Sequence, residues 1–212
     1  YLGRDEAGTW SQVIQRIPAE DSLTTWPVEY SDDGKELFWI DSRGRNTAAA
    51  VAEEVRTGNV HILTEDTRAD INSIVFDPVT SRPIAAAYRF DRTRWKVLDL
   101  DYKDDFETLA AQFSGDFVFN GMSDDRRRII VAHQQDARPL EYYCYDRASR
   151  KSRKLFSAQP RLENVPLVPM EPIMVCARDG LELPCYLSRP TQDGSGSGPM
   201  VLVVHGGPWS RD

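Results

Sequence analysis

The sequence has few of the residues that build disulfide frameworks, metal sites or membrane spans. Its 212 residues include three cysteines and three histidines, and it contains no Cys-x-x-Cys pair and no pair of closely spaced histidines. An odd and sparse set of cysteines does not form a disulfide framework, and zinc sites need closer ligands. No apolar run approaches the roughly 20 residues of a transmembrane helix. We therefore expect no disulfide, metal or cofactor, and we expect Cys144, Cys176 and Cys185 to be small buried hydrophobic residues.

Positive charge is also scarce. The net charge is −7 and the pI is about 5.1. The longest basic run, Arg126-Arg127-Arg128, directly follows two aspartates, so we interpret it as a solvated turn. An acidic surface without basic clusters predicts no nucleic-acid and no membrane partner. The first residues show no signal peptide, but Tyr1 is not a natural start, so the compartment (cytoplasmic or periplasmic) stays open.

A pattern of polar turns and apolar strands recurs about every 46 residues. Asp32, Asp77 and Asp124 each open a turn that is followed by a strand-like segment. Residues 46–55 are alanine-rich and would suit a helix by propensity, but the turn at residues 56–59 favours two strands. Strands are predicted at 36–40, 60–63, 83–88, 95–99, 129–132, 141–146 and 154–156. This period is typical of β-propeller blades, and a β-sandwich with accidental spacing is the alternative.

Four prolines mark a change of character after residue 160. Residues 161–172 lack periodicity, which predicts a crossing between domains. Residues 173–176 and 183–187 predict a hairpin with Asp179-Gly180 as its two-residue turn. That turn would place Cys176 opposite Leu183 and Cys185 opposite Met174, so that the cysteines lie diagonally on one face. The Gly-Ser repeat at residues 194–198 predicts a flexible loop.

The chain ends on an apolar run followed by His205-Gly206-Gly207-Pro208. Residues 200–204 are apolar at consecutive positions, which predicts a strand buried in a parallel sheet. Two glycines after such a strand expose backbone N–H groups that suit an oxyanion hole, whereas Pro208 has no N–H to donate. A simple Gly-Pro turn after a core strand is the alternative.

The order of these parts resembles the prolyl oligopeptidase family of serine peptidases, in particular its acylaminoacyl-peptidase and dipeptidyl-aminopeptidase-like bacterial members. The specific motifs are Arg178-Asp179-Gly180 and, about 25 residues later, His205-Gly206-Gly207-Pro208. The resemblance implies a β-propeller that caps an α/β-hydrolase domain and keeps folded proteins out. It also implies hydrolysis of short peptides by a Ser-Asp-His triad. Gly206 and Gly207 are assigned to the oxyanion hole, with Gly207 the favoured donor.

The expected architecture is mainly β. Residues 1–160 would be a partial β-propeller of about three blades, 161–172 the crossing, and 173–212 the first strands of the α/β-hydrolase domain. No Gly-x-Ser-x-Gly occurs, so the triad is expected beyond Asp212. We therefore expect the fragment to be inactive by itself and, because its sheet edges are open, to associate with itself.

Two other functions remain open: a propeller-capped acyl esterase, or a propeller binding module without catalysis. A group of loop residues would either line a peptide channel or be solvated turn residues: Arg89, Arg92, Arg94 and Trp95. His61 and His133 fall in predicted strands, where core or surface roles are favoured. His205 begins the glycine loop and is interpreted as structural.

Overall fold

The computed structural model describes residues 2–4, 9–13, 15–113, 116–190 and 198–207. The chain forms two compact units. The first consists of Tyr1–Arg89 and Arg94–Tyr102, and the second of Phe90–Thr93 and Lys103–Asp212. The described residues form antiparallel sheets and one α-helix, so the predicted mainly β class is confirmed.

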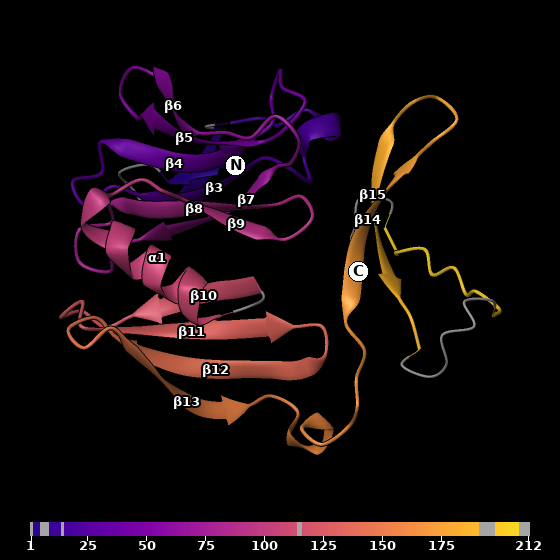
Figure 1. Ribbon diagram of the computed structural model, residues 1–212. Helices are drawn as coiled ribbons and strands as arrows, with labels where there is room; N and C mark the ends of the chain where they lie inside the picture. Colours follow the sequence, from indigo (N-terminus) through magenta and orange to yellow (C-terminus); the bar gives the residue numbers. More distant parts are fainter. Residues whose placement is uncertain (1, 5–8, 14, 114–115, 191–197, 208–212) are drawn as a thin grey trace. The chain divides into compact units, whose positions relative to one another are not determined.

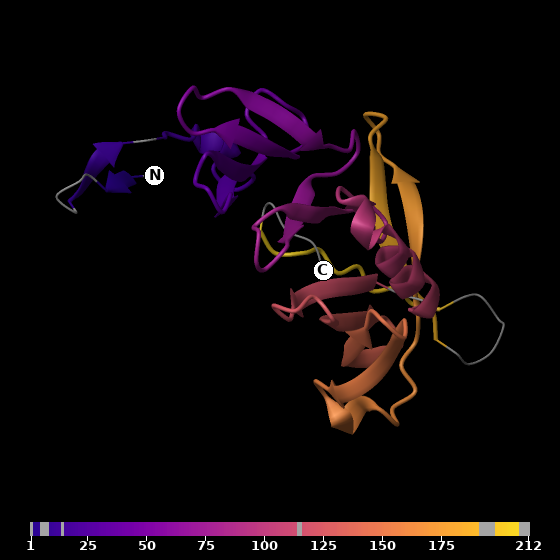
Figure 2. The same cartoon turned by 90° about the vertical axis from the view of Figure 1, so that its left-hand side faces the viewer.

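The first unit contains a four-stranded antiparallel sheet in which the strands follow chain order (Figure 1). Its strands are β3 (Trp26–Tyr30), β4 (Glu36–Asp41), β5 (Ala49–Glu54) and β6 (Val60–Thr64). The predicted strands at residues 46–55 and 60–63 are confirmed, because tertiary pairing outweighs the helix propensity of the alanines. Before this sheet, β1 (Leu2–Arg4) and β2 (Trp10–Val13) pair in a small hairpin, drawn in indigo in Figure 2, and η1 (Ala19–Asp21) follows.

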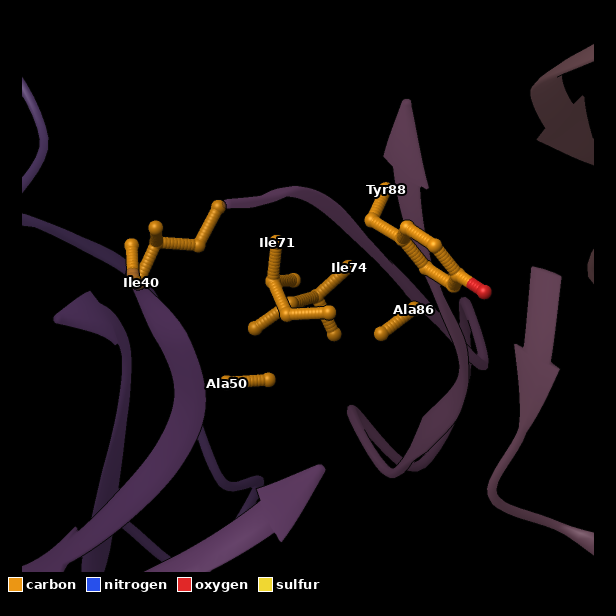
Figure 3. Packing of buried hydrophobic residues seen from close by; sticks show 7 residues of the cluster. Ile40, Ala50, Ile71, Ile74, Ala86 and Tyr88 are labelled. Atoms are coloured by element: carbon orange, nitrogen blue, oxygen red, sulfur yellow. The ribbon is translucent and has the colours of Figure 1, made fainter. Parts of the chain in front are cut away.

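The second sheet of the first unit has three strands, β7 (Ile71–Phe76), β8 (Pro83–Arg89) and β9 (Thr93–Val97), followed by η2 (Leu100–Tyr102). A cluster of seven side chains, each no more than 8% exposed, joins residues of both sheets (Figure 3). Three of the seven are alanines, so the backbones approach closely and the larger side chains fill the space between them. The seven are Ile40, Ala48, Ala50, Ile71, Ile74, Ala86 and Tyr88.

The second unit pairs a helix with another four-stranded antiparallel sheet. The elements are α1 (Lys103–Gln112), β10 (Asp116–Met122), β11 (Arg128–Gln135), β12 (Arg138–Asp146) and β13 (Lys151–Ser157). The helix α1 was not among the elements predicted from the sequence. Its buried side chains include Phe106 and Leu109, and the Phe106 ring lies 6.2 Å from that of Phe117 on β10. The helix therefore contributes to the core of this unit.

The turns confirm the repeat at the level of single hydrogen bonds. Ser31, Asp77 and Ser123 stand 46 residues apart. Each donates its backbone N–H to the carbonyl five residues later, at 2.9, 2.8 and 2.9 Å. Gly34 and Arg126, three residues into the first and third turns, both have a left-handed φ, of 66° and 58°. The periodicity in the sequence is therefore a periodicity of turn geometry.

A predicted detail of the last hairpin is wrong. After η3 (Pro160–Leu162), β14 (Met170–Cys176) pairs with β15 (Glu182–Ser188), but Cys176 stands opposite Glu182 and Cys185 opposite Ile173. The turn has three residues rather than two, because the N–H of Ala177 bonds to the carbonyl of Leu181 and Gly180 takes a φ of 89°. The extra residue shifts the register by one.

The register shift also changes the positions of the cysteines. Cys176 and Cys185 lie on opposite faces of the hairpin, because the position opposite Cys185 is three residues from Cys176. All three cysteines are free. Cys176 is exposed, and Cys144 and Cys185 are half-buried, so the prediction that they are buried is wrong.

The predicted buried strand at residues 200–204 is wrong as well. These residues are not in a strand, and their exposed fractions run from 73% to 84%. A strand needs a hydrogen-bonded neighbour to satisfy its backbone, and no strand in the described part of the chain pairs with this segment. Most of the predicted loop at residues 194–198 lies outside the described residues, as does Pro208.

Candidate functional site

The proposed oxyanion loop is exposed, and its two glycines differ. Gly207 has a φ of 134°, a conformation that side-chain-bearing residues rarely adopt. A Cβ placed on Gly206 would meet no atom within 4 Å, and no left-handed φ constrains this residue. The Nδ1 atom of the exposed His205 side chain lies 2.7 Å from the carbonyl oxygen of Gly206, and the structural role of His205 stays a prediction. The backbone therefore requires glycine at position 207 rather than at position 206.

The other two histidines follow the predicted alternatives of surface and core. His61 is exposed on β6, whereas His133 on β11 is only 5% exposed. The His133 ring lies 4.6 Å from the ring of Phe113, and its Nε2 atom is buried without a hydrogen-bond partner in the described structure. Burial lowers the pKa of this imidazole, so the neutral form is favoured in the folded state.

The residues predicted to line a channel fall in both compact units, and their role in a channel stays a prediction. Arg89, Arg94 and Trp95 belong to the first unit, and Arg92 belongs to the second. Two guanidinium nitrogens of Arg92 donate to the two carboxylate oxygens of Asp136, at 2.9 and 2.8 Å. This fork raises the pKa of Arg92 and lowers the pKa of Asp136. Arg92 thus has a structural partner.

Residues around Arg92 form a polar junction that the sequence did not reveal. Arg92 also donates to the carbonyl oxygen of Met170, at 2.9 Å, and the N–H of Met170 donates to Asp136, at 3.2 Å. The hydroxyl of Tyr186 donates to the carbonyl oxygen of Asp91, at 2.5 Å. The partners are far apart in sequence, so no local pattern could have identified them.

A second group of charges holds the beginning of the crossing. Lys154 on β13 donates to Glu141 on β12, at 2.5 Å, and to Glu163 just after η3, at 3.1 Å. Glu141 is 6% exposed and also accepts a hydrogen bond of 2.6 Å from the hydroxyl of Tyr143. Polar contacts thus tie both ends of the crossing to other residues of the second unit.

The described ranges contain no group of three or more His, Cys, Asp and Glu residues arranged to hold a metal ion. No helix within them is long and apolar enough to cross a membrane.

Comparison with known proteins supports the resemblance found in the sequence. No family model matches the chain. The chain is 42% identical over 218 residues to Dipeptidyl aminopeptidase BIII of Pseudoxanthomonas mexicana, an alignment that covers all of this chain and 32% of that protein. It is 25% identical over 230 residues to Dipeptidyl peptidase family member 6 of Caenorhabditis elegans, covering 98% of this chain and 31% of that protein.

The chain therefore spans about a third of the length of the curated relatives it matches. A solved structure from work on two prolyl endopeptidases aligns with a TM-score of 0.43 and 15% identity, over 77% of this chain and 31% of that one. The predicted resemblance to dipeptidyl-aminopeptidase-like members of the prolyl oligopeptidase family is confirmed, and the chain corresponds to a section of a longer relative.

Proposed function

We propose that this chain is part of a propeller-capped serine peptidase that cleaves short peptides. The observation that carries the proposal is the 42% identity to a dipeptidyl aminopeptidase along the whole chain. In this proposal residues 1–160 belong to the propeller, 161–172 are the crossing and 173–212 begin the α/β-hydrolase domain. The three meandering sheets with turns 46 residues apart support the propeller assignment.

The chemical contribution of this section is the glycine loop. Acyl transfer builds negative charge on the carbonyl oxygen, and backbone N–H groups aimed at it stabilise that charge. We assign this role to Gly206 and Gly207, with the N–H of Gly207 as the principal donor. The left-handed φ of Gly207 is consistent with a loop whose backbone, rather than its side chains, is functional. The nucleophile, base and acid would come from other parts of the protein, so the 212-residue chain alone would hydrolyse nothing.

The glycine assignment is tested in the full-length protein by a substitution at Gly207 and a control outside the glycine loop. Gly207→Pro removes the N–H and should lower turnover of a dipeptidyl p-nitroanilide by about 10²–10³-fold, while a serine-reactive probe still labels the enzyme slowly. Gly198→Ala, outside the glycine loop, is the matched control and should have little effect on turnover, because a Cβ there meets no atom within 4 Å and no left-handed φ constrains the residue. Unchanged turnover in Gly207→Pro would contradict the assignment.

The reaction class is tested by substrate choice. A peptidase should cleave dipeptidyl anilides faster than short acyl esters, whereas a propeller-capped acyl esterase would show the opposite preference. A binding module would bind peptide and cleave neither. If the propeller restricts access, an unfolded peptide should be cleaved and the same sequence inside a folded protein should not.

A further inference from the structure

The base of the β14–β15 hairpin is held by the loop between β8 and β9. The backbone of Asp91 accepts the Tyr186 hydroxyl, and Arg92 reaches both Asp136 and the carbonyl of Met170. Asp136 in turn accepts the N–H of Met170. The N–H and the carbonyl of Met170 and the hydroxyl of Tyr186 therefore all form hydrogen bonds with the β8–β9 loop or with Asp136.

Away from its base, the described part of this hairpin is largely exposed. An isolated two-stranded hairpin is marginally stable in water. The far end of the hairpin is exposed: Val175 is 42%, Leu181 63% and Leu183 43% exposed. Burial is concentrated nearer the base on β15, where Cys185, Tyr186 and Leu187 are half-buried. The hairpin is thus held at its base rather than along its length. We refer to the contacts of Arg92, Asp136 and Tyr186 at this base as the fastening.

The contacts of the fastening are polar, and the side chains that form them are partly exposed to solvent. The Arg92 and Asp136 side chains are 32% and 15% exposed, so water and ions reach the pair. A bidentate arginine–carboxylate fork fixes orientation as well as distance, which a lysine in the same place would not do. Such a contact specifies one position of the hairpin, yet a modest change in conditions weakens it.

We propose that Arg92 and Asp136 are positioning residues: they fix the hairpin where the chain leaves the crossing, and the catalytic role of Gly206 and Gly207 depends on the hairpin being held there. The effect on catalysis rests on the function proposed above. The fastening itself does not, because it is a property of contacts within the second unit.

Hydrogen exchange in the full-length protein tests the fastening directly. In Arg92→Ala and Asp136→Ala the amides of Met170, Glu171 and residues 173–176 should exchange at least about tenfold faster than in the wild type. Arg92→Lys keeps the charge but not the fork and should give an intermediate rate. Asp104→Ala is the matched control, because Asp104 also pairs with an arginine in this unit but does not touch the hairpin.

Exchange of the β11 and β12 amides reports whether each variant is folded. If those amides stay protected while residues 170–176 exchange at the wild-type rate in both alanine variants, the fastening is refuted. If exchange rises in the hairpin and kcat/KM for a dipeptidyl anilide falls at least about fivefold, while Asp104→Ala keeps both values, the positioning role is supported. If exchange rises but kcat/KM is unchanged in an enzyme that does cleave the anilide, the positioning role is refuted and the peptidase assignment stands. If the wild-type protein cleaves no anilide, the peptidase assignment fails and the exchange result still decides the fastening.

Discussion

The buried carboxylate of Asp105 should be the strongest single link between α1 and its sheet. Asp105 is 5% exposed and meets three donor groups: it accepts hydrogen bonds from the Tyr145 hydroxyl, at 3.0 Å, and from Nε of Arg147, at 2.8 Å, and Nη2 of Arg147 forms an ion pair with it at 2.8 Å. Tyr145 is fully buried. Its pKa is raised to about 12, mainly by burial and secondly by the hydrogen bond to Asp105. Replacing Asp105 with alanine leaves both partners without their acceptor.

The expected cost follows from these contacts. Breaking a buried ion pair on one side costs about 3–5 kcal/mol, and an orphaned buried hydroxyl about 1–3 kcal/mol. The Arg147 side chain is 23% exposed and would regain some water, so we expect about 3 kcal/mol for Asp105→Ala, below the sum of the two terms. At 1.36 kcal/mol per tenfold change, that corresponds to roughly a hundredfold faster exchange of the α1 amides.

Native-state hydrogen exchange of α1 measures this cost even if the whole protein does not unfold in two states. Tyr145→Phe removes one of the three donors and should give a smaller effect, about tenfold. Asp104→Ala removes an exposed pair with Arg150 and should change exchange less than about threefold. An increase below about fivefold in Asp105→Ala would refute the reasoning, since it would mean that the buried pair contributes no more than an exposed one.

Three further predictions concern pH, backbone strain and association. The lowered pKa of His133 means that the unfolded state binds more protons below pH 6.5, so the free energy of unfolding should fall as the pH drops from there toward the folded-state pKa. Glu141 and Asp116 face the ring and oppose this shift, and His133→Phe should flatten the pH dependence in urea titrations, so an unchanged slope would contradict the role of His133. Gly34→Ala should lower the free energy of unfolding by about 1–2 kcal/mol, because Gly34 has a φ of 66°. Gly198→Ala is the control, because Gly198 has no left-handed φ, and equal effects of the two substitutions would exclude backbone strain as the cause. The isolated 212-residue chain should self-associate at micromolar concentration through the exposed apolar residues 200–204, as measured by light scattering. Leu202→Lys should reduce this association, and a strictly monomeric wild type would contradict the prediction.

The parts of the fold that were predicted from sequence are those with local causes. Alternating apolar residues between Asp- and Gly-containing turns are enough to place the strands, and the hydrogen bonds of Ser31, Asp77 and Ser123 show why the spacing was informative. The helix was missed because it lies in a β context, although Asp104 and Asp105 in its first turn favour a helix start. The spacing of Phe106, Leu109 and Phe113 on one helix face was the available signal.

The errors concern features that depend on distant or exact partners. A one-residue difference in turn length, set by the left-handed φ of Gly180, changed the register of the last hairpin. The run at residues 200–204 has the composition of a buried strand, but burial requires neighbours that composition does not supply. The junction between Arg92 and Asp136 joins residues 44 apart in sequence, and no short motif encodes it. Of the candidate site, the glycine motif was visible in advance, whereas the backbone constraint on Gly207 required the structure.

The 46-residue spacing has a consequence for where the protein can be divided. Positions 46 residues after β6 fall inside α1, and positions 46 residues further on fall inside β13. The same place in successive repeats is therefore a strand, a helix and a strand, and the helix packs within the second unit through Asp105 and Tyr145. The boundary between the compact units, at Tyr102, cuts through the middle of a repeat. Truncations or repeat exchanges that follow the sequence period would separate α1 from its packing partners, whereas those that begin at Lys103 would keep them together.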